Sequence, residues 1–185
     1  RQPGIVALHA VTSTNALRFA FDAAADETTR QLILLQNGAF LALFRGNAEQ
    51  RNRNSNSRNT EFRIDQFEPV ALQNTGKDDK HVEYAQLEEL FETISGDRLK
   101  AAGKVLASLG KRGDPREFIQ AARVMVFRKG NDAHDYKFSS AVLEDYRHLS
   151  PRWRDRYLAS SVFNLTGSRG EDNKIVERTQ TALRA

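Results

Sequence analysis

The chain contains no cysteine, and this absence removes several kinds of chemistry at once. Without cysteine there are no disulfide bonds, no thiolate metal sites and no cysteine nucleophiles. No run of apolar residues approaches the roughly 18 that a membrane span needs, and no basic segment with an apolar signal core opens the chain. We therefore expect a cytoplasmic protein without a membrane-spanning segment, although a lack of cysteine does not itself define a compartment.

The short signatures of several common catalytic sites are absent as well. The sequence has no G-x-S-x-G elbow, no P-loop and no dinucleotide-binding fingerprint. Neighbouring carboxylates such as Glu88 and Glu89 point in different directions on a helix, so we interpret them as solvated charge. The four histidines are the scarcest chemically useful residues and thus the first candidates for a site.

The chain has 185 residues, which is the length of about one domain, and it carries a net charge of +4. Hydrophobic residues make up 39% of the chain and are concentrated in dense runs, which indicates a folded protein. The chain begins at Arg1 and enters an apolar helical pattern almost at once. We therefore expect residues 1–185 to form a single domain that is the C-terminal part of a longer chain.

Apolar residues recur at spacings of three and four along most of the sequence, and no strand-like alternation is present. This pattern predicts an all-α fold, either a bundle or an array of helical hairpins with about seven helices. The first two helices should form an antiparallel hairpin, and the second, apolar on nearly all sides, should be buried. The expected helices are residues 4–23, 26–44, 81–94, 99–109 closed by Gly110, one from Pro115 through Val126, one begun by the cap Asp132, and one from Pro151 through Phe163.

A long polar loop is predicted over residues 46–79, where asparagine, arginine, serine and glutamine dominate. Such a composition buries little apolar area, so we expect the loop to be partly docked and otherwise mobile. Its sizeable apolar residues are Phe62, Ile64, Phe67, Val70 and Leu72.

His134 and Lys137 are predicted to share one face of a helix, because residues three apart are neighbours on a helix surface. His9 lies on the apolar stripe of the first helix, where an imidazole is costly to bury without a partner or a ligand. The simpler interpretation is that each histidine is packed and hydrogen-bonded and that Lys137 reaches solvent. The sharper one is that His9 and His134 lie on facing helices and share an ion.

Two segments resemble the questin-oxidase-like family, a group of Baeyer-Villiger-type oxidases and their bacterial relatives. The first is residues 8–13, Leu-His-Ala-Val-Thr-Ser, which is similar to an H-x-V-T segment of that family. The second is residues 130–137, Gly-Asn-Asp-Ala-His-Asp-Tyr-Lys, which is similar to its G-N-D-x-H-x-x-K helix start. The segments occur in the expected order and correspond to the C-terminal half of such proteins.

This resemblance implies a non-haem iron oxygenase that acts on a small polycyclic aromatic or ketone substrate, with NADPH as a possible electron donor. It assigns metal-ligand roles to His9 and His134, and an accessory role to Lys137 as a carbamate. A desolvated lysine has a depressed pKa, and its neutral amine can take up carbon dioxide to become an anionic oxygen ligand. The remaining ligands would come from the N-terminal part of the same protein. Aromatic residues that could line a flat substrate pocket, or simply pack in the core, are Phe40, Phe44, Phe127, Tyr136, Trp153 and Phe163.

Two other functions are compatible with the same residues. One is a non-catalytic helical interaction domain in which the histidines are only packed. The other, less favoured, is nucleic-acid binding through a basic loop, because spaced arginines can follow a phosphate backbone. The arginines concerned are Arg45, Arg51, Arg53, Arg58 and Arg63.

Overall fold

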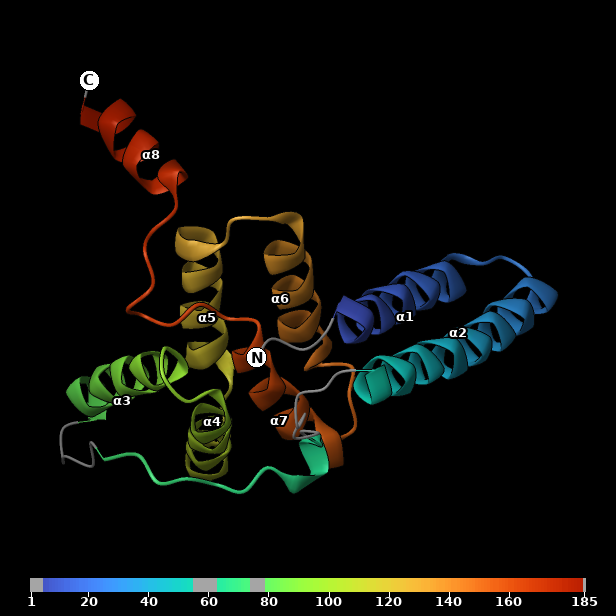
Figure 1. Cartoon of the computed structure of the whole chain (residues 1–185), viewed down its shortest axis with the longest axis horizontal. Helices are drawn as coiled ribbons and strands as arrows, with labels where there is room; N and C mark the ends of the chain where they lie inside the picture. The colour runs from blue at the N-terminus through green and yellow to red at the C-terminus, as the bar shows by residue number, and fades with distance from the viewer. Residues whose placement is uncertain (1–4, 55–62, 74–78, 185) are drawn as a thin grey trace. The chain divides into compact units, whose positions relative to one another are not determined.

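The computed structural model describes residues 5–54, 63–73 and 79–184, and this part of the chain is all-α (Figure 1). It contains eight α-helices and two short 3-10 helices and no strand, which confirms the predicted fold class. None of the helices in these ranges is long and apolar enough to cross a membrane. Two compact units are distinguished, Arg1–Phe62 and Arg63–Ala185, and each is described by itself. That both units form a single domain stays a prediction.

The first unit is the predicted antiparallel helical hairpin of α1 (Ile5–Ala23) and α2 (Glu27–Asn54) (Figure 1). Asp26 caps the start of α2, since its carboxylate accepts hydrogen bonds from the backbone N–H of Thr29 at 2.8 Å and from the Thr29 hydroxyl at 2.7 Å. Between the helices, the hydroxyl of Thr14 donates to the side-chain oxygen of Asn37 at 3.2 Å.

Helix α2 extends well past its predicted end near residue 44 and past the predicted loop start at residue 46. The prediction placed a loop here because the residues are polar, and it overlooked ion pairs between residues at helical spacing. Arg45 and Glu49 are four residues apart and form an ion pair at 3.1 Å, an arrangement that supports a helix through a polar stretch. The predicted loop is therefore wrong up to Asn54, and residues 55–62 and 74–78 lie outside the described part.

The segment of residues 63–73 belongs to the second unit and is docked there, as predicted for part of the loop, through two of the apolar residues named for it, Ile64 and Phe67. It includes the 3-10 helix η1 (Ile64–Gln66), followed by Phe67, which is only 3% exposed. The Phe67 ring packs against the Phe163 ring with centroids 5.8 Å apart. One guanidinium nitrogen of Arg156 donates to the carbonyls of Ile64, Asp65 and Phe67 at 3.2, 3.0 and 2.7 Å.

Five helices around a common core form the body of the second unit. Asp97 caps α4 by accepting a hydrogen bond from Lys100 N–H at 3.0 Å, and Pro151 occupies the first turn of α7, as the sequence predicts. Helix α4 does not end at Gly110, because the left-handed conformation that terminates it is adopted by Gly113, with φ of 70°. The bounds are α3 (Asp79–Ile94), α4 (Arg98–Arg112), α5 (Arg116–Lys129), α6 (Ala133–Asp145) and α7 (Pro151–Ser160), which continues into the 3-10 helix η2 (Ser161–Phe163).

Lys104 and Glu89 form a buried ion pair between α4 and α3. The Lys104 ammonium lies 2.6 Å from Glu89 Oε1 and donates to the Thr93 hydroxyl at 2.8 Å, and the two charged side chains are 5% and 11% exposed. The Glu89 carboxylate also accepts the backbone N–H of Gln73. The interpretation of Glu89 as solvated charge is therefore wrong, because this helix position faces α4 and the docked segment.

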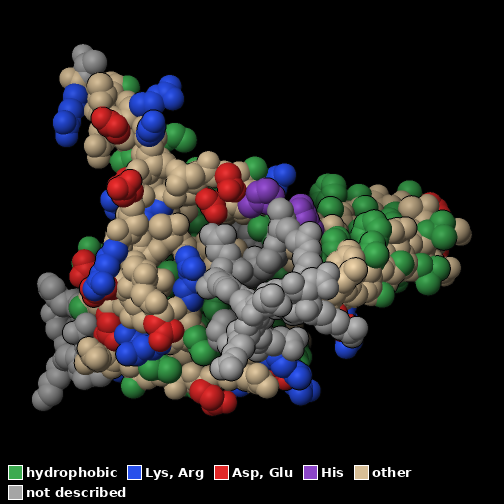
Figure 2. Space-filling model, viewed as in Figure 1, with side chains coloured by type: hydrophobic (Ala, Val, Ile, Leu, Met, Phe, Trp, Pro, Cys, Tyr) green, Lys and Arg blue, Asp and Glu red, His purple; other side chains and the backbone are tan. Residues whose placement is uncertain are grey.

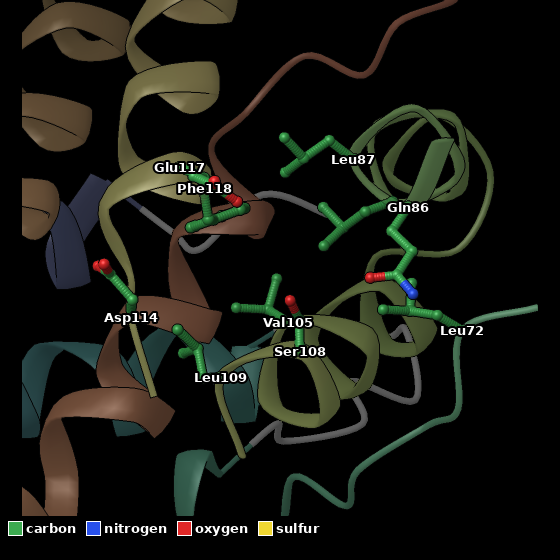
Figure 3. A pocket seen from close by; sticks show the side chains of 10 residues that line it. Leu72, Gln86, Leu87, Val105, Ser108, Leu109, Asp114, Glu117 and Phe118 are labelled. Atoms are coloured by element: carbon green, nitrogen blue, oxygen red, sulfur yellow. The ribbon is translucent and has the colours of Figure 1, made fainter. Parts of the chain in front are cut away.

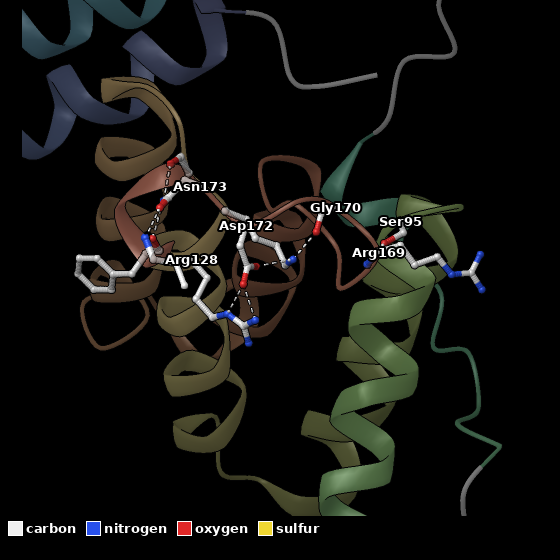
Figure 4. A network of polar contacts seen from close by, with 10 residues as sticks. Ser95, Arg128, Arg169, Gly170, Asp172 and Asn173 are labelled. Atoms are coloured by element: carbon white, nitrogen blue, oxygen red, sulfur yellow. Dashed lines mark hydrogen bonds and ion pairs between the residues drawn. The ribbon is translucent and has the colours of Figure 1, made fainter. Parts of the chain in front are cut away.

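Residues 167–173, which we call the strap, cross from α3 to α5 through backbone hydrogen bonds (Figure 4). The strap N–H of Ser168 donates to the Phe91 carbonyl at 3.0 Å. At its other end the Asn173 side-chain amide donates to the carbonyls of Phe127 and Gly130 at 2.7 and 2.9 Å. The Asn173 side-chain oxygen in turn accepts from the first N–H groups of α8 (Lys174–Arg184), a helix that the sequence analysis did not predict.

The strap also carries an ion-pair network with the end of α5 (Figure 4). The Asp172 carboxylate pairs with Arg128 at 2.6 Å and with Lys129 at 2.9 Å, and the buried Lys129 ammonium also donates to the Gly170 carbonyl. Hydrogen bonds from these two cations hold the pKa of Asp172 below its usual range.

Gly103 is the point of closest approach between α4 and the docked segment. A Cβ atom at this position would lie 2.5 Å from Val70 Cγ2 and 2.6 Å from the Glu68 carbonyl oxygen. The Val70 N–H donates to the Gly103 carbonyl at 2.9 Å. Only a residue without a side chain fits between the helix and this backbone.

We therefore predict that Gly103→Ala destabilises the protein, whereas Gly110→Ala in the same helix does not. A Cβ at Gly110 meets nothing within 4 Å, so alanine there should raise the free energy of unfolding by up to about 1 kcal/mol through helix propensity. At Gly103 the clash with backbone should outweigh that gain and lower the free energy of unfolding by about 1 to 3 kcal/mol. Urea denaturation of both variants measures the difference, and equal effects would contradict the docking of residues 67–70 on α4.

Candidate metal site at the start of α6

The first turn of α6 is organised by two aspartates that satisfy backbone N–H groups without a helical partner. Asp132 Oδ1 accepts from the N–H of His134 at 2.7 Å and of Asp135 at 3.2 Å, which confirms Asp132 as the predicted cap. Asp135 reaches back and accepts from the N–H of Asn131 at 2.9 Å. The segment Asn-Asp-Ala-His-Asp thus forms a helix start whose backbone N–H groups are hydrogen-bonded by its own two aspartates.

Asp132 also places a negative charge next to the His134 ring. Its Oδ1 lies 3.5 Å from His134 Nδ1, and the His134 side chain is 45% exposed. Hydrogen bonds from the N–H groups of His134 and Asp135 hold the pKa of Asp132 below its usual range, so the carboxylate is charged near neutral pH. A carboxylate at one ring nitrogen is the arrangement that orients metal-binding histidines in many proteins.

Lys137 follows His134 by three residues on the same helix, as predicted, and its side chain is exposed. A carbamate forms on a lysine that is removed from water, so the surroundings within this unit do not by themselves favour it. Tyr136, between them, turns the other way. Its hydroxyl donates to the Gly130 carbonyl at 2.9 Å and its ring lies 6.4 Å from that of Phe127.

His9 is on α1 in the first unit, where its side chain is exposed. On the same helix, the hydroxyl of Thr12 donates to the Leu8 carbonyl at 3.1 Å. Within its own unit the His9 side chain is exposed and that of His134 is partly exposed, so neither is buried in the core of that unit. Since His9 belongs to one unit and His134 to the other, their convergence on one ion stays a prediction.

Within the described ranges, no group of three or more His, Cys, Asp or Glu side chains lies close enough together to hold a metal ion. The second unit contributes one imidazole and one amine at the start of α6. That further ligands for a metal at His134 and Lys137 come from another part of the protein stays a prediction.

The cavity among α3, α4 and the start of α5 is too small for an organic substrate (Figure 3). Its volume is about 10 Å³, which is close to the space of a single water molecule. Aliphatic side chains and the Phe118 ring form most of its wall, with polar atoms from Gln86, Ser108 and Asp114.

A shallow surface groove of about 410 Å³ lies beside α7, where Trp153 and Tyr157 form an aromatic wall. This volume is within the range of small-molecule sites. The groove includes Leu149, which follows α6, whereas His134 lies in the first turn of α6. At a rise of about 1.5 Å per residue the two ends of that helix are roughly 15 to 20 Å apart, so the groove does not face a metal bound at His134.

The aromatic residues expected to line a substrate pocket are distributed over separate places. Phe40 and Phe44 contact each other in the first unit, with ring centroids 6.1 Å apart. In the second unit Phe163 is buried in the core, while Phe127 is 69% exposed. Core packing, the simpler interpretation, holds for Phe163, and Trp153 alone of the six lines the groove beside α7.

The arginines considered for nucleic-acid binding do not form one flexible basic loop in the described part. Arg45 lies within α2 and pairs with Glu49, and Arg63 pairs with Asp65 at 3.1 Å. The side chains of the other three lie outside the described residues. Two of the five charges are therefore partly neutralised by carboxylates of the same chain.

Comparison of the chain with protein-family models, with curated proteins and with solved structures finds no match.

The cap at Asp132 leads to a prediction about stability near neutral pH. Asp132→Ala removes the acceptor for two N–H groups and should lower the melting temperature by a few degrees, whereas Asp132→Asn retains a capping oxygen and should change it little. Differential scanning calorimetry of the two variants at pH 7 measures this difference. Equal losses would show that the charge, and not the cap, stabilises the helix start.

The same carboxylate makes the effect of Asp132→Ala depend on pH. Because the pKa of Asp132 is lowered on folding, its stabilising contribution is complete above the unfolded value of about 3.9 and is lost as the pH falls through the lower folded value. The gap in melting temperature between wild type and Asp132→Ala should therefore narrow below about pH 4. A gap that stays constant in that range would contradict the assigned hydrogen bonds.

Proposed function

We propose that the chain is part of a questin-oxidase-like oxygenase, an oxidoreductase that acts on a polycyclic aromatic or ketone substrate at a non-haem iron centre. The two sequence segments around His9 and His134 support the family assignment. The observation that carries the proposal is the placement of Asp132 beside His134 Nδ1, 3.5 Å away at a capped helix start. This arrangement suits an imidazole that binds a metal through its other nitrogen.

In this proposal His9 and His134 act as neutral imidazole ligands, and Lys137, as a carbamate, adds one anionic oxygen. Such a set suits Fe(II), which when bound can activate dioxygen at its open positions. The protein's own contribution is to hold the ligands: the cap at Asp132 fixes the backbone of His134, and helix geometry places Lys137 one turn further on. Electrons would come from a donor such as NADPH.

The proposed role of Lys137 sets a condition on the complete protein. Lys137 is exposed in the second unit, so carbamate formation requires that another part of the polypeptide cover it and exclude water. The N-terminal part of the same protein, expected to supply the remaining ligands, is the proposed source of this cover. His134, in contrast, needs no rearrangement of its own helix.

A second candidate, a non-catalytic helical interaction domain, is favoured by one observation. Several leucines of α2 are more than half exposed, among them Leu32 at 60% and Leu35 at 71%. Exposed apolar surface of this kind commonly marks a protein interface. This function would leave the histidines without a metal.

The metal test uses the full-length protein purified without chelators. We predict that His9→Ala and His134→Ala each reduce bound iron and dioxygen consumption severalfold, because a ligand is lost, while helix content stays unchanged. His148→Ala is the matched control, since His148 is also an exposed histidine of the second unit and has no proposed ligand role. Elemental analysis of each protein gives the iron content.

Substitutions of Lys137 distinguish a role as a carbamate ligand from a role as a positively charged side chain. Lys137→Arg keeps the charge but cannot form a carbamate, so it should lose iron as Lys137→Ala does. Retention of iron by the arginine variant would exclude the carbamate. Absence of any transition metal from the wild-type protein, with a melting temperature unaffected by Fe(II), would refute the oxygenase and leave the interaction domain as the better account.

A further inference from the structure

The side chain of Asn173 binds two helix ends at once (Figure 4). Its amide nitrogen donates to the carbonyls of Phe127 and Gly130 at 2.7 and 2.9 Å, at the end of α5, and we call these two bonds the Asn173 clamp. Its amide oxygen accepts from the N–H groups of Ile175 and Val176 at 3.1 and 3.3 Å, in the first turn of α8. Asn173 is only 7% exposed, so water has little access to these bonds.

Asparagine is the residue type that this set of bonds requires. The last carbonyls of a helix and its first N–H groups have no partner within the helix. Asparagine carries two N–H donors and an acceptor oxygen on one short side chain, so it can satisfy both kinds of group. Aspartate would cap α8 equally well but has no N–H to donate to α5. A single substitution can therefore remove the clamp and leave the cap in place.

The Gly130 carbonyl connects the Asn173 clamp to α6. The same oxygen accepts a second hydrogen bond, from the hydroxyl of Tyr136 at 2.9 Å. The approach is close here, because a Cβ atom at Gly130 would lie 3.3 Å from the Tyr136 ring and 2.6 Å from the Val126 carbonyl oxygen. One buried carbonyl thus receives a donor from α6 and a donor from the strap.

The bonds within the start of α6 act over a shorter range. Asp132 and Asp135 accept only from N–H groups of residues 131–135, so they define the shape of the first turn. They do not hold this turn against another element. The bond from Asn173 reaches the connection between α5 and α6 from 43 residues further along the chain. It therefore ties this connection to the strap.

We propose that Asn173 is a positioning residue for His134 and Lys137. Together with Tyr136 it holds the Gly130 carbonyl, and in this way it fixes the orientation of α6 relative to α5. The direction in which His134 and Lys137 leave the helix depends on that orientation. This inference rests on the proposed metal site, because a metal needs its ligands held within a narrow range of directions.

The anchored side of α6 differs from the side that carries the proposed ligands. At 100° per residue, Tyr136 lies about 200° around the helix from His134 and about 100° from Lys137. His134 is 45% exposed and Lys137 is exposed, and histidine and acidic side chains are visible at the surface in Figure 2. The Asn173 clamp can therefore act on the two side chains without touching them.

Amide hydrogen exchange of the full-length protein, followed by mass spectrometry, tests the clamp without metal. Asn173→Asp should speed the exchange of residues 131–137 by about tenfold or more, because the loss of a buried hydrogen bond favours local opening. The first turn of α8 should stay protected, since a carboxylate can still cap it. Unchanged exchange of residues 131–137 in this variant would overturn the proposal.

Two further variants serve as control and as milder probe. Asp172→Asn weakens the ion pairs of the strap with Arg128 and Lys129, neither of which belongs to α6, so it should leave residues 131–137 unchanged. Equal effects of Asp172→Asn and Asn173→Asp would show a general structural role and overturn the proposal. Tyr136→Phe removes only the other donor to Gly130 and should speed the same exchange by a smaller factor. If Asn173→Asp does not fold, an unchanged rate in Tyr136→Phe would overturn the proposal.

The iron content of the full-length protein, purified without chelators, tests the use of this anchoring. Asn173→Asp should lower bound iron severalfold, whereas Asp172→Asn should retain the wild-type amount. Wild-type iron content in Asn173→Asp would overturn the positioning role and leave the proposed oxygenase intact. An iron-free wild-type protein would instead refute the proposed function, and a role of Asn173 at a metal site with it, whatever the exchange rates.

Discussion

The close approach that small residues allow along α4 is the constraint on which the second unit depends. Ala101 and Ala102 are fully buried, and Gly103 leaves no room for a Cβ beside Val70 and Glu68. Without bulky side chains at these positions, neighbouring backbone can reach α4 and form hydrogen bonds with it, as Val70 does. The segment of residues 63–73 is therefore held against the core of the unit through the buried Phe67 and the partly buried Val70, although most of its residues are exposed.

Two buried lysines form ion pairs that connect elements packed around this core. The ammonium groups of Lys104 and Lys129 are almost inaccessible to water, and each has a carboxylate and a further oxygen as partners. Removal of one partner from such a group leaves a charge or a polar atom unsatisfied in a medium of low polarity, which is strongly unfavourable. The Lys104 pair joins α3 to α4, and the Lys129 pair joins the strap to α5.

The candidate metal site differs from these connections in its exposure. His134 lies in the capped first turn of α6 next to Asp132, and its side chain is 45% exposed. Lys104 and Lys129 each form an ion pair with a carboxylate of the same unit, whereas the Lys137 side chain is exposed. The start of α6 therefore combines a well-defined capped backbone with exposed side chains, and a metal site there stays a proposal.

The sequence by itself determined the all-α class, the α1–α2 hairpin and the helix starts at Asp97, Asp132 and Pro151. These features depend on interactions between residues a few positions apart, namely apolar spacing and capping, which can be read along one dimension. It also indicated His134 and Lys137 as neighbours, because both are on one helix.

Only the tertiary structure decided the features that join residues distant in the chain. The burial of Glu89 by Lys104, the docking of Phe67 and the clamp of Asn173 on the end of α5 each depend on which helix face meets which neighbour. The sequence could name Phe67 as an apolar residue available for docking, but not the surface that it meets, because the burial of a residue also depends on the element packed against it.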